Sequence, residues 1–125
     1  MEHIKIFLLV ILSISFLKVT AQPKITISEI NYKSDKSMDS EDWLELWNYG
    51  TVQEDLSNWV IQGEKFNEIF QVPMGTILPP GGRIVLARDN IKFQQINPDV
   101  PFLGPFIFRL SGKGQNVRLY DNTST

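Results

Sequence analysis

The chain has 125 residues, no cysteine, and 12 basic against 14 acidic residues, a formal net charge of −2. This length accommodates one domain, and the lack of cysteine excludes disulfides, cysteine-ligated zinc and a thiol nucleophile. The charge also argues against a basic nucleic-acid-binding protein, so we expect no nucleic acid among its partners.

Residues 1–21 have the three-part organisation of a secretory signal peptide. A lysine gives a positive start, residues 6–17 form an apolar run, and residues 19–21 place small or β-branched side chains before a cut at Gln22. A retained membrane anchor is the alternative, but the run has about a dozen residues where a spanning helix needs roughly 20. We expect a cleaved signal, a mature domain at 22–125, and no stable membrane insertion after cleavage.

Turn signals divide the mature part into short segments in which apolar and polar side chains alternate, a pattern typical of β-strands. Each segment is therefore expected to bury one face. The expected strands, in chain order, are residues 24–30, 42–47, 57–62, 68–72, 83–88, 106–110 and 116–120. Short antiparallel strands in this number predict an all-β, two-sheet β-sandwich, with a barrel as the alternative.

Two regions depart from this alternation. Residues 78–82 (LPPGG) predict a tight turn, because proline fixes φ and glycine admits positive φ. Further on, Asp89 is placed to cap a short helix that runs to Asn97 and ends at Pro98. Residues 99–105, with two prolines and a glycine, are expected to be extended or turning.

Five short motifs follow one another at plausible spacing. They are ISEINY at 27–32, DWLELWNYG at 42–50, DLSNWVI at 55–61, ILPPGGRIVLA at 77–87 and LSGKGQNVRLYD at 110–121. In this order they resemble the lamin tail domain (LTD) family, and the resemblance covers nearly all of residues 25–121. That family is an immunoglobulin-like β-sandwich found in nuclear lamins and in many exported bacterial proteins. The resemblance therefore implies an immunoglobulin-like sandwich for this chain, here with one short helix.

Some positions depart from the family pattern. Ser28 stands where the family often has Asn, Trp47 where Tyr is usual, and Asn58 where Gly usually precedes Trp59. If position 58 needs a positive φ, Asn is the next best residue after Gly. Family members normally continue past Asp121 into a turn and a further strand, so we expect a C-terminally truncated domain, a fragment without its last strand.

A narrower resemblance comes from residues 93–99, which contain Asn97-Pro98-Asp99, and from Gly104-Pro105-Phe106. Both are similar to the bacterial secreted type of the domain that lies N-terminal to a spore-coat-H-type (CotH-like) kinase domain. No kinase residues occur in this chain, so the resemblance implies no kinase activity for it.

Glu29 and Glu45 are expected mid-strand among apolar residues, Glu29 on the face of the first strand's isoleucines and Glu45 on a face shared with two tryptophans. A buried carboxylate pair can serve acid/base catalysis, because burial raises a carboxylate's pKa. The single histidine, His3, lies in the expected signal. The resemblance makes both glutamates part of the fold's signature, held by loop backbone or an arginine. We therefore expect no catalytic residues and no enzyme.

The segment between the first two expected strands, residues 33–42, carries four acidic side chains that could bind Ca²⁺. These are Asp35, Asp39, Glu41 and Asp42. Their spacing does not follow an EF-hand, so a solvated loop without metal or cofactor is favoured and Ca²⁺ binding stays open as the alternative.

Five aromatic residues could form a sugar-binding platform. They are Tyr32, Trp43, Trp47, Tyr49 and Trp59. The apolar neighbours of Trp59 favour a core position instead. Charge is also uneven, since the acidic residues concentrate in 29–68 and the basic ones in 70–125. This distribution indicates either two partner-binding patches or acidic and basic segments that lie side by side in the sandwich, and we favour the second.

These observations predict a non-catalytic, secreted binding, adhesion or spacing module of an exported bacterial protein. The expected partner is a protein or glycan at the cell surface, with the chain secreted, periplasmic or at the surface. The first alternative is the N-terminal accessory domain of a larger exported enzyme, kinase-like or nuclease-like. The second is a free-standing structural protein.

Overall fold

The computed structural model describes residues 21–123, so all of the expected signal peptide except Ala21 lies outside the described residues. No helix within 21–123 is long and apolar enough to cross a membrane. The elements in chain order are β1 (Ile25–Asn31), the 3-10 helix η1 (Lys36–Met38), β2 (Trp43–Asn48), β3 (Glu54–Asp55), β4 (Val60–Gln62), β5 (Ile69–Gln71), β6 (Ile77–Leu78), β7 (Arg83–Ala87), α1 (Asn90–Ile96), β8 (Phe102–Leu103) and β9 (Arg118–Tyr120).

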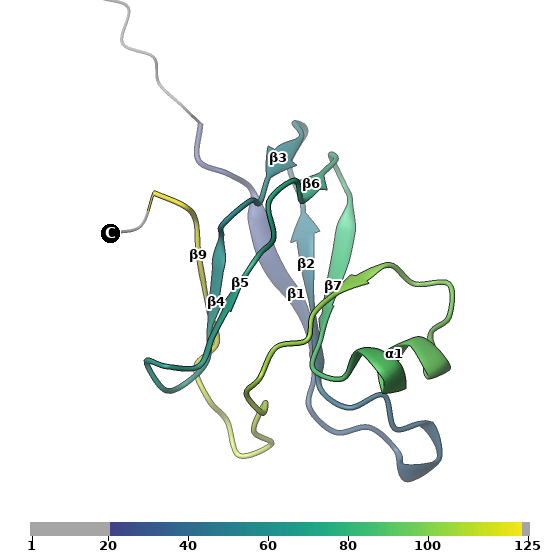
Figure 1. Cartoon of the computed structure of the whole chain (residues 1–125). Helices are drawn as coiled ribbons and strands as arrows, with labels where there is room; N and C mark the ends of the chain where they lie inside the picture. The colour runs from purple at the N-terminus through teal and green to yellow at the C-terminus, as the bar shows by residue number, and fades with distance from the viewer. Residues whose placement is uncertain (1–20, 124–125) are drawn as a thin grey trace, which may run out of the picture.

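The strands form two main sheets around a shared core (Figure 1). One sheet has the order β1-β2-β7-β8 and the other β5-β4-β9, while β3 and β6 make a small separate pair at one end. The pairs are antiparallel apart from β7 and β8, which are parallel because α1 lies in the crossover between them. The predicted all-β, immunoglobulin-like fold with one short helix is confirmed.

The main core lies between these sheets. β2 shows why the sequence alternates as it does: Leu44 and Leu46 are fully buried, whereas Trp43, Glu45 and Trp47 lie half-buried on the opposite face. The buried members of the core are Leu44, Leu46, Leu56, Trp59, Ile61, Val72, Leu78, Leu86, Phe106, Phe108 and Leu110. Each such side chain contributes about 1.5–3 kcal/mol of burial, and these contributions hold the domain together without a disulfide.

A second, smaller apolar cluster covers the outer face of the four-stranded sheet. The helix α1 begins as predicted, because the Asp89 carboxylate accepts hydrogen bonds from the N–H groups of Ile91 and Lys92 at 3.1 and 3.0 Å. Its Phe93 is only 2% exposed and packs edge-on against Trp43 and Phe102. The remaining members of this cluster are Val85 and Ala87 of β7.

The expected strand at 106–110 is wrong, although its alternation is right. Phe106, Phe108 and Leu110 are buried and Ile107 is exposed, but this segment joins no sheet among the described residues. Its backbone N–H groups find acceptors outside a β-ladder. The Phe106 N–H donates to the Ala87 carbonyl, and the Leu110 N–H donates to the Asp42 carboxylate. Burial on one face therefore does not require a strand partner.

Some boundaries also differ from the expectation. The expected strand at 57–62 is reduced to β4, because Ser57 and Asn58 form a turn in which Asn58 has a φ of 64°. This positive φ confirms the predicted role of Asn in place of Gly. The two-residue strands β3, β6 and β8 were not expected, since two residues are too few to show a period.

A β-bulge in β1 changes which face Glu29 occupies. Ile27 lies opposite Leu46 of β2, but Glu29 lies opposite Glu45, so the register shifts by one residue at Ser28. Directly opposed residues point to the same face of a sheet, so Glu29 shares the outer face with Glu45 and not the inner face with Ile27. The expected placement of Glu29 with the isoleucines is therefore wrong.

Candidate functional site

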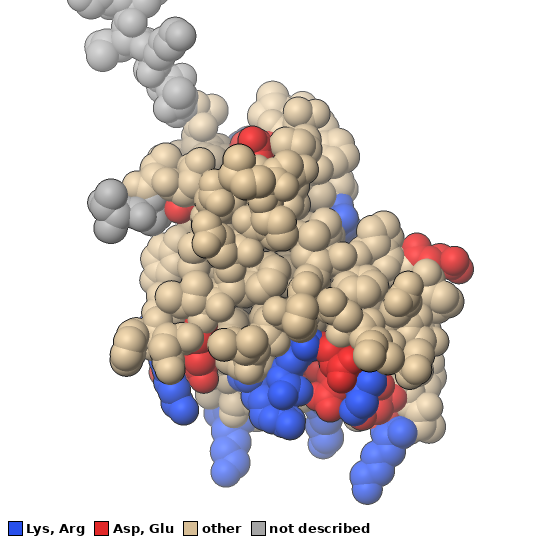
Figure 2. All heavy atoms as spheres, viewed as in Figure 1, with Lys and Arg blue, Asp and Glu red and all other residues tan. Residues whose placement is uncertain are grey.

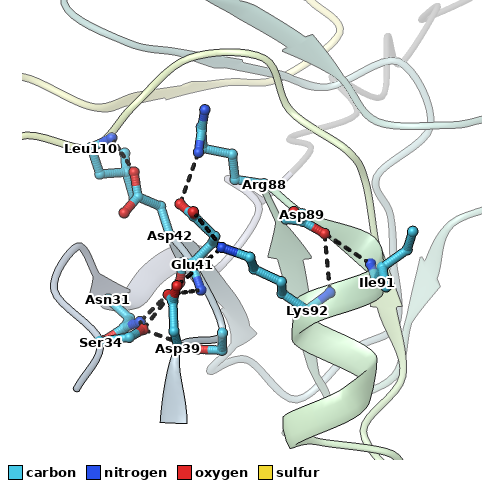
Figure 3. A network of polar contacts seen from close by, with 11 residues as sticks. Asn31, Ser34, Asp39, Glu41, Asp42, Arg88, Asp89, Ile91, Lys92 and Leu110 are labelled. Carbon is cyan, nitrogen blue, oxygen red and sulfur yellow. Dashed lines mark hydrogen bonds and ion pairs between the residues drawn. The ribbon is translucent and has the colours of Figure 1, made fainter. Parts of the chain in front are cut away.

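Charged side chains gather at the lower end of the face drawn in Figure 2, while its upper part is largely uncharged. The acidic loop, residues 33–42, meets α1 at this end (Figure 3). Lys92 Nζ lies 3.0 Å from Asp39 Oδ2 and 2.9 Å from Glu41 Oε1, and Arg88 pairs with Glu41 Oε2 at 2.9 Å. The hydrogen bonds to Lys92 and to the Glu41 N–H hold the pKa of Asp39 below its usual range.

Asp42 at the end of the acidic loop is 7% exposed. Its Oδ2 accepts a 2.7 Å hydrogen bond from the backbone N–H of Leu110. Burial raises the pKa of Asp42, and the Leu110 N–H and the nearby Arg88 oppose that rise only in part. This carboxylate is thus a structural acceptor for a segment that lacks a strand partner.

Other oxygens of the acidic loop are held by donors of the loop itself and of β1. Asp35 accepts bonds from the Ser37 N–H and hydroxyl at 2.8 and 2.6 Å, which lower the pKa of Asp35. The Asn31 amide donates to Ser34 and to the Glu41 carbonyl. Within residues 21–123 no three His, Cys, Asp or Glu side chains converge in a way that could hold a metal ion. The loop is organised by hydrogen bonds and ion pairs, which the sequence pattern did not reveal.

The second expected carboxylate, Glu45, lies on the outer face of the four-stranded sheet. Its Oε1 accepts bonds from the Ser28 hydroxyl at 2.7 Å and from Arg83 at 2.6 Å. Burial raises the pKa of Glu45, but the Ser28 and Arg83 contacts outweigh it and the pKa lies below the usual value. A carboxylate with a lowered pKa is a weaker general base, so these contacts fit the structural role in which an arginine holds Glu45.

The five aromatic residues do not share one surface. Trp59 is 6% exposed in the main core, as predicted, and Trp43 packs under α1 against Phe93. Trp47 carries the Arg83 guanidinium 4.6 Å above its ring and contacts Tyr49, which is half exposed. This cation–π contact occupies a ring face that a sugar would need.

An open groove lies between the edge strands β1 and β9. It has a volume of about 410 Å³ and is lined on one side by Ile25 and Ile27 and on the other by Val117 and Leu119. These four side chains pack on the core but remain half-buried, and Trp59 also lines the groove. Sequence alternation places the four residues on the inner face, but no local pattern indicates that the sandwich is open along this side.

A second hollow of about 370 Å³ continues from the groove. The two share Gln22, Pro23, Trp59 and Asp121, and the second one adds Glu54 and Asp55 of β3. The groove is therefore lined by apolar side chains along the strands and by the acidic residues Glu54, Asp55 and Asp121 at one end. Its volume is in the range of ligand-binding sites.

The uneven charge along the sequence is explained by neighbours in space. Each ion pair among the described residues joins an acid of 29–68 to a base of 70–125: Arg83 to Glu45, Arg88 to Glu41, and Lys92 to Asp39 and Glu41. The favoured interpretation, that acidic and basic segments lie side by side, agrees with these pairs.

The fold and these contacts define a small β-sandwich domain in which ion pairs join the acidic loop to Arg88 and Lys92, and Glu45 to Arg83. Residues 18–125 match the family model of the Lamin Tail Domain. The chain therefore belongs to the lamin tail domain family, which confirms the resemblance deduced from its motifs. No curated protein and no solved structure matches the chain.

Proposed function

We propose that this chain is a non-catalytic binding module that acts after export, with a protein or glycan at the cell surface as its partner. The observation that carries the proposal is the groove between β1 and β9, in which half-buried apolar side chains lie open along two sheet edges. By contrast, Glu45 and Asp42 are occupied by donors of the fold itself. The signal-like residues 1–21 support export.

Expression of the full chain in a bacterial host tests both parts of this proposal. The exported product is expected to begin at Gln22, which N-terminal sequencing of periplasmic, surface and medium fractions would establish. The product is then immobilised and exposed to surface-protein and polysaccharide fractions, with heat-unfolded protein as the control. Saturable binding to the folded form is expected. A product that stays in the cytoplasm, or that retains nothing from either fraction, would refute the proposal.

The alternative role is that of an N-terminal accessory domain of a larger exported enzyme. The observation that favours it is the crossover from β7 through α1 and β8 to Phe106, which carries the Asn97-Pro98-Asp99 and Gly104-Pro105-Phe106 motifs of the narrower resemblance. The coding sequence downstream of codon 125 decides this point. An open reading frame that continues into a kinase-like or nuclease-like domain is expected under this alternative, and an immediate stop codon contradicts it.

A further inference from the structure

The expected signal cleavage creates a reactive N-terminus. A cut between Ala21 and Gln22 places a glutamine first in the exported chain. In an N-terminal glutamine the α-amino nitrogen can reach Cδ of its own side-chain amide, because their bond closes an unstrained five-membered ring. The residue itself holds the two reacting groups close together, which favours an intramolecular reaction.

The fold leaves both reacting groups of Gln22 accessible. Gln22 is exposed, and within residues 21–123 its side-chain amide takes part in no hydrogen bond. The nearest backbone group held by the fold is the Lys24 carbonyl, which accepts a 2.9 Å hydrogen bond from the Tyr49 N–H, and β1 begins at the next residue. Ring closure at Gln22 therefore breaks no hydrogen bond of the described fold.

We propose that Gln22 is a modification site at which the exported chain carries an N-terminal pyroglutamate. The α-amino nitrogen attacks Cδ, the new bond between them closes a lactam, and the bond from Cδ to Nε2 breaks. One proton passes from the α-amino group to the departing nitrogen, which leaves as ammonia. The reaction consumes no oxidant, cofactor or second substrate, and it removes the terminal positive charge. This inference rests on the proposed export of the chain.

Pro23 gives this modification a protective role. A free amino group with proline at the second position is the substrate of exopeptidases that remove an N-terminal dipeptide ending in proline. The same dipeptide can also leave without an enzyme, as a cyclic dipeptide, when the α-amino nitrogen attacks the Pro23 carbonyl carbon. Both reactions need the free amine, and both shorten the chain to Lys24, whose carbonyl is bound by Tyr49. A lactam at Gln22 blocks both of them.

Mass spectrometry of the exported protein tests the proposal. The full chain is expressed in a bacterial host, and its amino groups are labelled at harvest, so that ring closure during later handling is not counted. Cleavage after Glu29 then releases the peptide 22–29, which contains one lysine, Lys24. This peptide is expected to be lighter by one ammonia and to carry a single label, on Lys24. A free N-terminus would carry a second label on Gln22.

The variant Gln22→Asn is the matched control. It keeps a side-chain amide, but the side chain is one methylene shorter, so the same attack would have to close a strained four-membered ring. Its peptide 22–29 is expected to keep its ammonia and to carry two labels. A proline-specific dipeptidyl peptidase should then remove the first two residues from the variant and none from the wild type. Equal resistance of the two proteins would contradict the protective role.

The same spectra separate failure of this inference from failure of the proposed function. An exported wild-type chain that begins at Gln22 with two labels on peptide 22–29 overturns the inference and leaves export intact. A wild-type chain that begins at Lys24 does the same, because it shows that the amine stayed free long enough for the dipeptide to be lost. A product that retains residues 1–21 refutes the proposed export itself.

Discussion

Asp42 Oδ2 lies 2.7 Å from the backbone nitrogen of Leu110, 68 positions later in the chain. This bond joins the start of β2 to the segment that carries Phe106, Phe108 and Leu110 into the core without a strand partner. The Asp42 side chain thus supplies the hydrogen-bond acceptor that a neighbouring strand would supply in a β-ladder.

Removal of that acceptor is expected to be costly. Asp42→Ala leaves the buried Leu110 N–H without its partner, which should lower the free energy of unfolding by about 1–3 kcal/mol. Asp42→Asn keeps an acceptor oxygen and removes a buried charge, so it should be near neutral at pH 7. Urea unfolding of the three proteins measures the differences. Equal losses in both variants would show that the negative charge, and not the acceptor, is what matters.

The same residue has a defined pH signature. The pKa of Asp42 is raised in the folded state, so between its unfolded value of 3.8 and its folded value the native state binds more protons than the unfolded state. Its contribution to the free energy of unfolding therefore falls as pH rises through that window. Wild type measured against Asp42→Asn should lose relative stability from pH 3.8 upward and then level off. A relative gain over that interval would contradict the burial of this carboxylate.

The helix α1 offers a matched pair of apolar residues. Phe93 is 2% exposed and Ile91 is 71% exposed on the same seven-residue helix. Phe93→Ala empties the centre of the outer cluster and should cost about 3–5 kcal/mol, whereas Ile91→Ala should stay within about 0.5 kcal/mol. Chemical denaturation provides both values. A small effect of Phe93→Ala would mean that α1 contributes little to the stability of the sandwich.

The turn before β4 tests a backbone requirement. Asn58 has a φ of 64°, and its side chain contacts Gln71 and Met74. Asn58→Gly and Asn58→Ala both remove those contacts, so the difference between them reports the backbone alone. The Gly variant should be more stable than the Ala variant by about 1–2 kcal/mol, the cost of the left-handed conformation for a residue with a Cβ. Thermal unfolding of the two variants measures this, and equal stabilities would argue against a positive φ.

The ion pairs between the acidic loop and α1 should depend on salt. The hydrogen bonds of Lys92 to Glu41, and to a lesser extent to Asp39, raise the pKa of Lys92. The lysine side chain is nevertheless partly exposed. Lys92→Gln is expected to lower Tm by no more than about 4 °C, and less in 1 M NaCl, because screened surface pairs contribute little. Lys113→Gln is the control, since Lys113 is exposed and belongs to none of the ion pairs of the described residues. A loss that does not change with salt would point to packing of the lysine stem.

The sequence alone determined the fold class, the family and most of the core. Period-two alternation places Leu44 and Leu46 inward and identifies the inward side chains of 106–110, and Asp89 marks the start of α1. Each of these signals is local, because it depends only on side chains a few positions apart and on the geometry of a strand or a helix turn. The role of Asn58 is also a local signal, because it depends only on the φ of that residue.

Only the tertiary structure decided the remaining features. The bulge at Ser28 turns Glu29 to the outer face, Asp42 binds Leu110, and Lys92 holds the acidic loop. The groove depends on which strands are left at the edges of the two sheets. Each of these contacts joins residues distant in sequence, so no local period encodes it. The physical reason is that pairing register and edge position depend on how complete sheets pack, which involves residues far apart in the chain.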